Sequence, residues 1–126
     1  MKLHALVATN LNIVTGYGPG YIEINGTRHA GSLILGADSL QPWSVAAFES
    51  LRPEDFDPVI GLKPEVVLFG TGARYRLPPA GLAARLSRAG IGLEAMDTNA
   101  ACRTYNILVS DGRRVAGALL QEHAKP

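Results

Sequence analysis

Hydrophobic and polar positions alternate with a period of two near the start of the chain, which predicts short antiparallel strands. Residues 21–24 (Tyr-Ile-Glu-Ile) show this alternation, and Asn25-Gly26 follows them directly. Asn-Gly is the preferred pair for a two-residue type I′ turn, so we expect the chain to return as a hairpin from Thr27 onward. Residues 11–15 predict a further strand, and the glycines within 16–20 predict a turn or a mobile loop.

The middle of the chain is less regular. The apolar run 31–36 predicts a strand, whereas residues 38–64 contain Pro42, Pro53, Pro58 and Pro64. Within this part we expect 43–51 to form a strand or a turn of helix. Residues 53–57 predict a short helical start with Pro53 at the first helical position, where its missing N–H costs nothing.

Apolar runs and helical patterns then alternate. The continuous run 65–70 predicts a strand buried on both faces. Residues 80–89 predict a helix, 91–95 and 114–120 predict strands, and 121–126 is expected to be a tail. A strand–helix–strand unit joins parallel neighbours. The fold class is therefore α/β, with a mixed sheet, an antiparallel N-terminal hairpin and a C-terminal βαβαβ arrangement.

A helix over 97–112 carries several polar residues. Asp97 or Thr98 suits its N-cap, and Gly112 suits the position just after its end. Two adjoining stripes at helical spacing contain Ala101, Tyr105 and Leu108, and Cys102, Asn106 and Val109. Polar groups on partly apolar stripes are costly to bury without partners. The polar residues of this helix therefore indicate either an internal hydrogen-bond network or a recognition surface.

Composition narrows the class of protein. A chain of 126 residues with 47% hydrophobic and 18% charged residues is typical of one globular domain, which we take as 1–126. Twelve basic against 11 acidic side chains give a net charge of +1, which offers no electrostatic footprint for nucleic acid or an anionic membrane.

Targeting signals are not evident in the sequence. One cysteine forms no intramolecular disulfide and fits a reducing compartment. The apolar part of residues 1–10 is too short for a signal peptide, and no run is long enough to cross a bilayer. We therefore expect a cytoplasmic location.

The segment Gly70-Thr71-Gly72, followed by Arg74, has two interpretations. Its backbone N–H groups could form a nest that binds an anion, or the glycines could simply make a tight exit from the strand. The lysine of a phosphate loop is missing, and no Gly-x-Gly-x-x-Gly spacing is present.

Reactive and metal-binding side chains are sparse. Cys102 would lie near a helix N-terminus beside Arg103, which favours a thiolate, but no histidine is adjacent and we favour a packing role. One cysteine and three scattered histidines do not supply a closed zinc site. We therefore expect no metal, no cofactor and no catalytic constellation.

Arg103, Tyr105 and Asn106 remain ambiguous. In one interpretation Arg103 pairs with Asp97 or Glu94, and Asn106 bonds a strand or loop backbone. In the other, the three side chains face a pocket beside the Gly-Thr-Gly segment, because ligands of open α/β sheets favour the carboxyl ends of the strands. Trp43 is expected to be a core or lid anchor, with a surface hot spot as the alternative.

Several segments together resemble a known family. They are 21–26, 32–35, Trp43, 69–72, 90–91, 96–98, 101–106 and 111–113. In this order they are similar to the Mth938-domain family, and the resemblance extends from about Ile13 to Leu120. It implies a three-layer α/β fold with a mixed sheet and supplies no catalytic residues. The mitochondrial branch of that family includes the respiratory complex I assembly factor 3.

The expected function follows from this resemblance. It implies a non-enzymatic accessory protein that binds a protein partner, such as an assembly intermediate of a membrane or respiratory complex. The alternative is a small-molecule or anion-binding protein, or an enzyme of unknown reaction, that uses the Gly-Thr-Gly segment, Arg74 and Arg103. A thiol-redox role for Cys102 is a third hypothesis. A homodimer could form through the edge of the Asn25-Gly26 hairpin.

Overall fold

The computed structural model describes residues 11–122, which form a mixed α/β fold. Its strands are β1 (Val14–Gly18), β2 (Tyr21–Ile24), β3 (Thr27–Ala30), β4 (Leu33–Gly36), β5 (Ser39–Pro42), β6 (Val66–Gly70), β7 (Gly92–Met96) and β8 (Val115–Leu119). Its helices are the short η1 (Phe48–Ser50), η2 (Pro53–Phe56) and α2 (Asp57–Ile60), followed by α3 (Leu82–Arg88) and α4 (Thr98–Ser110).

The strands form two sheets. A three-stranded antiparallel sheet has the order β1-β2-β3, and a five-stranded sheet has the order β5-β4-β8-β6-β7. In the larger sheet β6 is parallel to β7 and to β8, whereas β4 is antiparallel to β8 and β5. The predicted mixed sheet and the parallel β6–β7 pair are confirmed.

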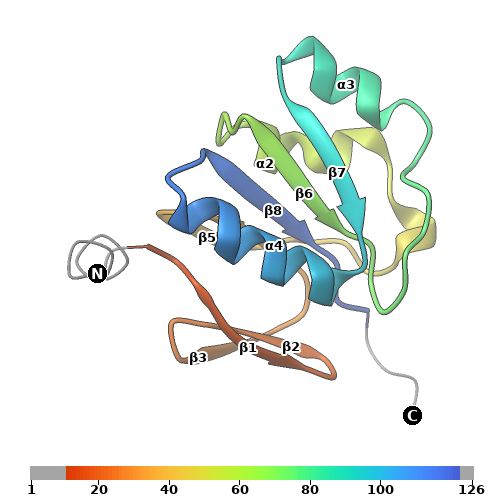
Figure 1. Cartoon of the computed structure of the whole chain (residues 1–126). Coiled ribbons are helices and arrows are strands. Elements are labelled where there is room, and N and C mark those ends of the chain that lie inside the picture. Colours follow the sequence, from red (N-terminus) through yellow and green to blue (C-terminus); the bar gives the residue numbers. More distant parts are fainter. Residues whose placement is uncertain (1–10, 123–126) are drawn as a thin grey trace.

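Alternate side chains of the five-stranded sheet enter two separate cores. On β6, Val67 and Phe69 pack on the side of α3, while Leu68 packs on the side of α4. Figure 1 shows α4 crossing one face of this sheet, with the three-stranded sheet beside it, and α2 and α3 on the other side. The apolar run 65–70 is continuous because its strand is buried on both faces, as predicted.

The N-terminal hairpin forms at the predicted turn. Asn25 and Gly26 both adopt positive φ, at 51° and 87°, as a type I′ turn requires. The strand before it was misplaced, however. Residues 11–15 were expected to form it, but β1 runs to Gly18 because Gly16 pairs with Glu23 in the ladder rather than turning away.

The irregular middle segment contains a strand that the sequence analysis missed, β5, which ends at Pro42. Pro53 does occupy the first position of η2, as predicted. Trp43 is 5% exposed, and its Nε1–H donates to the Asp55 carbonyl at 2.8 Å. Its ring meets Phe56 edge to face at 5.1 Å between centroids. Trp43 is therefore a core anchor and not a surface hot spot.

The end of the described chain is attached to the domain. Residues 121–126 were expected to be a tail, yet the Gln121 N–H donates to Ser32 Oγ at 2.8 Å, and Glu122 accepts a hydrogen bond from the Phe48 N–H at 2.9 Å. Residues 123–126 lie outside the described residues. Residues 1–10, in which no signal peptide is predicted, lie outside them as well. Within 11–122, no helix has both the length and the hydrophobicity needed to cross a membrane.

Candidate functional site

Helix α4 begins at the predicted cap. Asp97 accepts a hydrogen bond from the Ala100 N–H at 2.9 Å and is the N-cap. Thr98, the alternative cap, is the first helical residue and is buried. Its hydroxyl accepts from the Gly72 N–H at 2.8 Å and donates to the Leu120 carbonyl at 2.7 Å. Thr98 therefore joins the start of α4 to the segments that follow β6 and β8.

Asn106 and Tyr105 fasten α4 to the N-terminal part of the chain. The Asn106 side chain donates to the Val14 carbonyl at 2.8 Å and accepts from the Val14 N–H at 2.9 Å. Tyr105 is fully buried, and its hydroxyl donates to the Asn12 carbonyl at 2.8 Å. The expectation that Asn106 bonds a strand backbone is confirmed, so these polar residues form an internal network.

Arg103 does not make the ion pair with Asp97 or Glu94 that one of the two interpretations predicted. Its Nη1 donates to the Tyr17 hydroxyl at 2.7 Å instead. Asp97 already accepts the capping hydrogen bond at the start of the helix. Arg103 is exposed and extends the contact between α4 and β1 at the surface.

Cys102 is buried at 1% exposure between α4 and the sheet. Burial raises the pKa of its thiol to about 12, and the neighbouring Arg103 charge opposes this shift only in part. The thiol is therefore protonated at neutral pH, which is the state of a packed cysteine rather than of a nucleophile.

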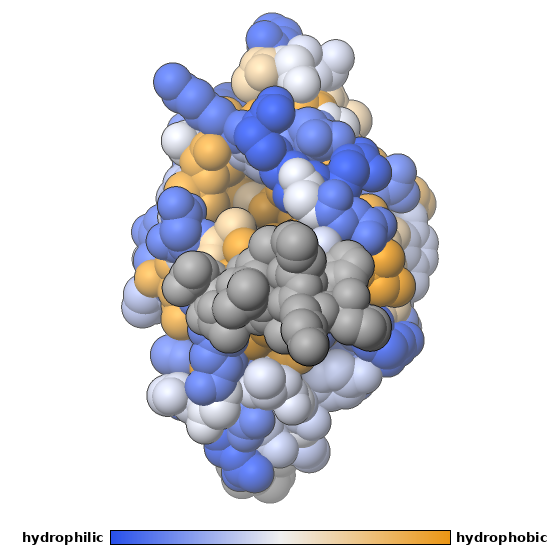
Figure 2. Space-filling view, turned by 60° about the vertical axis from the view of Figure 1, so that its left-hand side comes forward, coloured by the Kyte–Doolittle hydropathy of each residue, from blue (hydrophilic) through white to orange (hydrophobic). Residues whose placement is uncertain are grey.

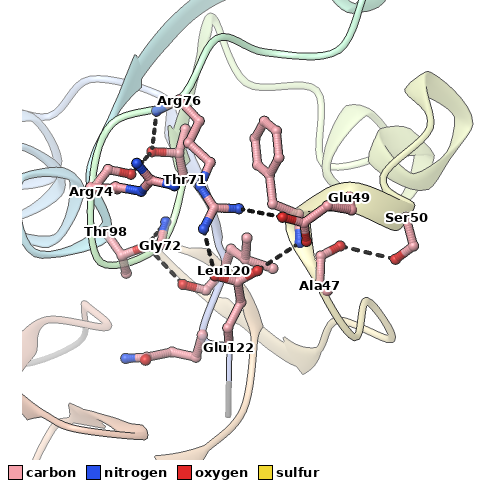
Figure 3. A network of polar contacts seen from close by, with 12 residues as sticks. Ala47, Glu49, Ser50, Thr71, Gly72, Arg74, Arg76, Thr98, Leu120 and Glu122 are labelled. Atoms are coloured by element: carbon pink, nitrogen blue, oxygen red, sulfur yellow. Dashed lines mark hydrogen bonds and ion pairs between the residues drawn. The ribbon is translucent and has the colours of Figure 1, made fainter. Parts of the chain in front are cut away.

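The Gly70-Thr71-Gly72 segment forms a closed strand exit. The Thr71 N–H donates to the Met96 carbonyl at 2.8 Å, and the Gly72 N–H donates to Thr98. The Thr71 hydroxyl donates to the Arg74 carbonyl at 2.7 Å, which tightens the next turn (Figure 3). Both N–H groups are thus bonded within the protein, and an anion at this segment would have to displace one of these bonds.

A charged network that the sequence analysis missed lies next to this exit. Arg76 contacts Glu49 at 3.3 Å and Glu122 at 3.4 Å, and its guanidinium lies 5.0 Å from the centre of the Phe48 ring. Figure 3 shows these side chains converging from the loop after β6, from η1 and from the segment after β8. Arg76 Nε is buried and has no hydrogen-bond partner among the described residues.

No sequence pattern marks this network. Arg76 is 27 residues from Glu49 and 46 from Glu122, so neither pair has helical or hairpin spacing. The residues meet because β6 and β8 are parallel neighbours, so both strands finish at the same end of the sheet. A search for charged residues at short spacing along the sequence would therefore not predict these ion pairs.

Three clefts on the described surface lie away from the predicted site residues. One has a volume of about 450 Å³ and is lined in part by Leu62, Lys63, Val109, Arg113 and Arg114. It lies where β8 begins, at the opposite end of the sheet from Gly-Thr-Gly. Figure 2 turns this side forward and shows hydrophobic surface in a hollow between hydrophilic rims.

Two other clefts, with volumes of about 390 and 460 Å³, adjoin β3, β5 and Trp43. These three clefts contain none of the residues predicted for a ligand site. In the part of the chain that the structure describes, no three His, Cys, Asp or Glu side chains are grouped closely enough to bind a metal ion.

Comparison with known proteins identifies relatives along nearly the whole chain. The model of a family described as a protein of unknown function (DUF498/DUF598) matches residues 14–120. An uncharacterized protein of Rhodobacter capsulatus is 37% identical over 111 residues, which cover 85% of this chain and 82% of that protein.

A further relative has a named role. The NADH dehydrogenase [ubiquinone] 1 alpha subcomplex assembly factor 3 of Bos taurus is 36% identical over 110 residues. The alignment covers 85% of this chain and 59% of the bovine protein. The described domain thus corresponds to a part of that longer protein.

A solved structure supports the same relationship. The solution structure of a Bordetella pertussis protein, described as a Mth938-like domain, has a TM-score of 0.82 and 34% identity. The matched region covers 93% of this chain and 90% of the Bordetella pertussis chain. The chain therefore belongs to the DUF498/DUF598 family and has the Mth938-like fold that its sequence motifs predict.

Proposed function

We propose that this chain is a cytoplasmic, non-enzymatic accessory protein that binds another protein and assists the assembly of a membrane or respiratory complex. The observation that carries this proposal is the 36% identity to the bovine assembly factor over 110 residues. Since 41% of the bovine protein has no counterpart in the alignment, the proposal concerns the partner contact that one such domain can make.

The use of the polar side chains supports a binding role over a chemical one. Tyr105, Asn106, Thr98 and Thr71 each bond a backbone group inside the protein. The buried Cys102 has a thiol pKa of about 12. Groups held in this way stabilise the fold and are not poised to activate a substrate.

The loop after β6 offers a surface for a partner. Tyr75 and Leu77 are 54% and 77% exposed, and they flank Arg76, which Glu49 and Glu122 hold in place. Such anchoring lowers the entropy lost when a partner binds. Tyrosine is also enriched among the residues that dominate protein interfaces.

The experiment is affinity purification of the tagged full chain from its own cells, with gently solubilised membranes included. Wild type, Leu77→Ser and Arg103→Ala are compared, with Ser110→Ala as an exposed control. We expect wild type and the control to recover respiratory-complex or membrane-insertion components, and Leu77→Ser or Arg103→Ala to lose them. Recovery of the chain alone in every sample would refute the proposal.

The cleft beside the start of β8 favours a second candidate, an anion-binding protein. Lys63, Arg113 and Arg114 bring positive charge to its lining, although Asp38 also lines the cleft and Arg113 already pairs with Glu65 at 2.7 Å. Anion binding by Gly70-Thr71-Gly72, Arg74 and Arg103 stays a separate prediction. A thermal-shift screen with phosphorylated metabolites tests both sites, using Arg114→Ala and Arg74→Ala to tell them apart. No rise in melting temperature with any compound would exclude this candidate.

Self-association through the N-terminal hairpin is also a proposal. β3 is an edge strand of the smaller sheet, and three of its four residues are exposed. Edge strands provide unpaired backbone groups for a second copy of the chain. Sedimentation of the wild type at rising concentration would show a dimer, and an Ala30→Pro variant should then remain monomeric.

A further inference from the structure

The free edge of β7 provides a binding surface whose partner can be specified further than that of the loop after β6 or of β3. This strand is the last in the order of the five-stranded sheet and pairs with β6 alone (Figure 1). It contains no proline, and β6 on its inner side is fully buried over Val67 to Gly70. The strand is thus paired on one side, and within the described residues no strand pairs with it on the other.

The hydrogen bonds at the two ends of β7 define which backbone groups are free. The Gly92 N–H donates to the Glu65 carbonyl at 3.0 Å, and the Met96 carbonyl accepts from the Thr71 N–H at 2.8 Å. Because backbone groups alternate in direction along a strand, Leu93 and Ala95 direct their N–H and C=O groups outward. No hydrogen bond within 11–122 occupies these outward groups.

Apolar surface flanks this edge on both faces of the sheet. On one face Leu93 and Ala95 are half-buried against the core beneath α3. On the other face the Thr104 hydroxyl of α4 contacts Met96 Sδ at 3.4 Å. Ile107, one turn further along the same flank of α4, is 62% exposed. An added strand would therefore find apolar neighbours above and below.

Glu94 decides which kind of strand fits. It is exposed at the centre of β7, and no ion pair of Glu94 occurs in the described part of the chain. In a second copy of this chain, antiparallel pairing of both free groups would set Leu93 against Ala95 and Glu94 against Glu94. Like charges directly opposite destabilise a strand pair, whereas opposite charges stabilise it.

We propose that β7 binds an extended segment of the partner protein as an added strand, with a lysine or arginine opposite Glu94 and apolar residues on either side of it. This inference rests on the proposed function, since it specifies where and how the partner binds. The main-chain bonds to Leu93 and Ala95 supply affinity, and the Glu94 pair supplies specificity.

The probes are two synthetic ten-residue peptides of alternating valine and threonine that differ at one central residue, lysine or glutamate. Binding to the full chain is measured by fluorescence polarisation, and amide exchange is followed by NMR. We expect the lysine peptide to bind and to slow exchange at the Leu93 and Ala95 amides. The glutamate peptide should bind about tenfold more weakly, and Glu94→Lys should invert this preference.

Backbone dependence is tested with Ala95→Pro, which removes an outward N–H that β6 does not use. Ala95→Val is the matched control that keeps this group. The lysine peptide should lose binding to the proline variant and bind the valine variant. Because the charge inversion in Glu94→Lys needs no proline, it tests the proposal even if Ala95→Pro misfolds.

Three results would overturn the proposal: equal binding of both peptides, exchange protection elsewhere than β7, or a wild-type dimer that Ala95→Pro dissociates. Purification from cells separates this failure from failure of the proposed function. If wild type and Ala95→Pro recover the same respiratory components, the β7 surface is wrong and the accessory role stands. If neither recovers any, the accessory role fails, and the peptide titration still judges the edge.

Discussion

The Asn106 carboxamide joins α4 to the N-terminal sheet through two hydrogen bonds. Asn106 bonds both the N–H and the carbonyl of Val14, a contact between residues 92 positions apart. An aspartate at this position could accept from the N–H but could not donate to the carbonyl, and an alanine could do neither. The residue type is therefore set by the need to satisfy both backbone groups of β1 at once.

Asn106→Ala should lower the free energy of unfolding by about 1–3 kcal/mol, because it leaves the two Val14 backbone groups without their partner. Urea denaturation measures this change. Asn99→Ala is the control, since Asn99 is exposed in the first turn of the same helix. Equal stability of the two variants would contradict a structural role for Asn106.

Cys102 should react with an alkylating reagent at pH 8 only after the protein unfolds. Burial raises the thiol pKa from 9.0 to about 12, so the folded protein holds this proton more tightly than the unfolded chain. The resulting stability is present in full below pH 9.0 and is lost as the pH rises toward 12. Mass spectrometry measures the alkylation. A native protein that gains the mass of one reagent molecule at Cys102 would contradict the prediction.

At the scale of elements, the sequence predicts the structure correctly where local chemistry decides it. Asp97 caps α4 and Asn25-Gly26 forms its turn because each outcome depends on neighbouring residues. The strand β5 was missed because Ser39–Pro42 has half-exposed and exposed positions, and its pairing with β4 alone makes it a strand. Isolated propensity does not report such pairing.

The junction between β6 and α4 explains a glycine that the sequence analysis assigned to a possible anion site. A Cβ on Gly70 would lie 2.8 Å from Thr98 Oγ1 and 2.9 Å from Thr98 Cα. Thr98 cannot move away without giving up its bonds to Gly72 and Leu120. Close packing of a helix start against a strand end is enough to require glycine here.

Gly70→Ala should therefore destabilise the protein by about 1–3 kcal/mol through overpacking. Gly16→Ala is the control, because a Cβ there would meet Glu23 at an ordinary 3.5 Å. Thermal denaturation should separate the two variants clearly. A Gly70→Ala protein as stable as the control would mean that α4 can shift at little cost.

At the scale of the whole molecule, three distant segments meet at Arg76, and this is the part of the candidate site that the sequence could not predict. Glu49 comes from η1 and Glu122 from beyond β8, and their approach depends on the finished sheet. The Arg103 contact with Tyr17 likewise spans 86 residues. Contacts of this range follow from topology and leave no short motif.

The two glutamates of this network should differ in importance. Glu122→Gln should weaken both the contact with Arg76 and the hydrogen bond from the Phe48 N–H, with a loss of about 1–2 kcal/mol. Glu49→Gln should change stability little, because the Glu49 side chain is 76% exposed and surface ion pairs contribute little. Chemical denaturation of both variants, with amide exchange at Phe48, checks this order. Equal losses would contradict it.

The central position of β8 has a consequence for synthesis of the protein. β8 is the last described strand along the chain, yet it lies between β4 and β6 in the five-stranded sheet. Until residues 115–119 leave the ribosome, β4 can pair only with β5, and β6 only with β7. Isolated strand pairs are marginally stable in water. The nascent chain therefore presents two apolar, unpaired strand edges to chaperones until nearly all of the domain has been translated.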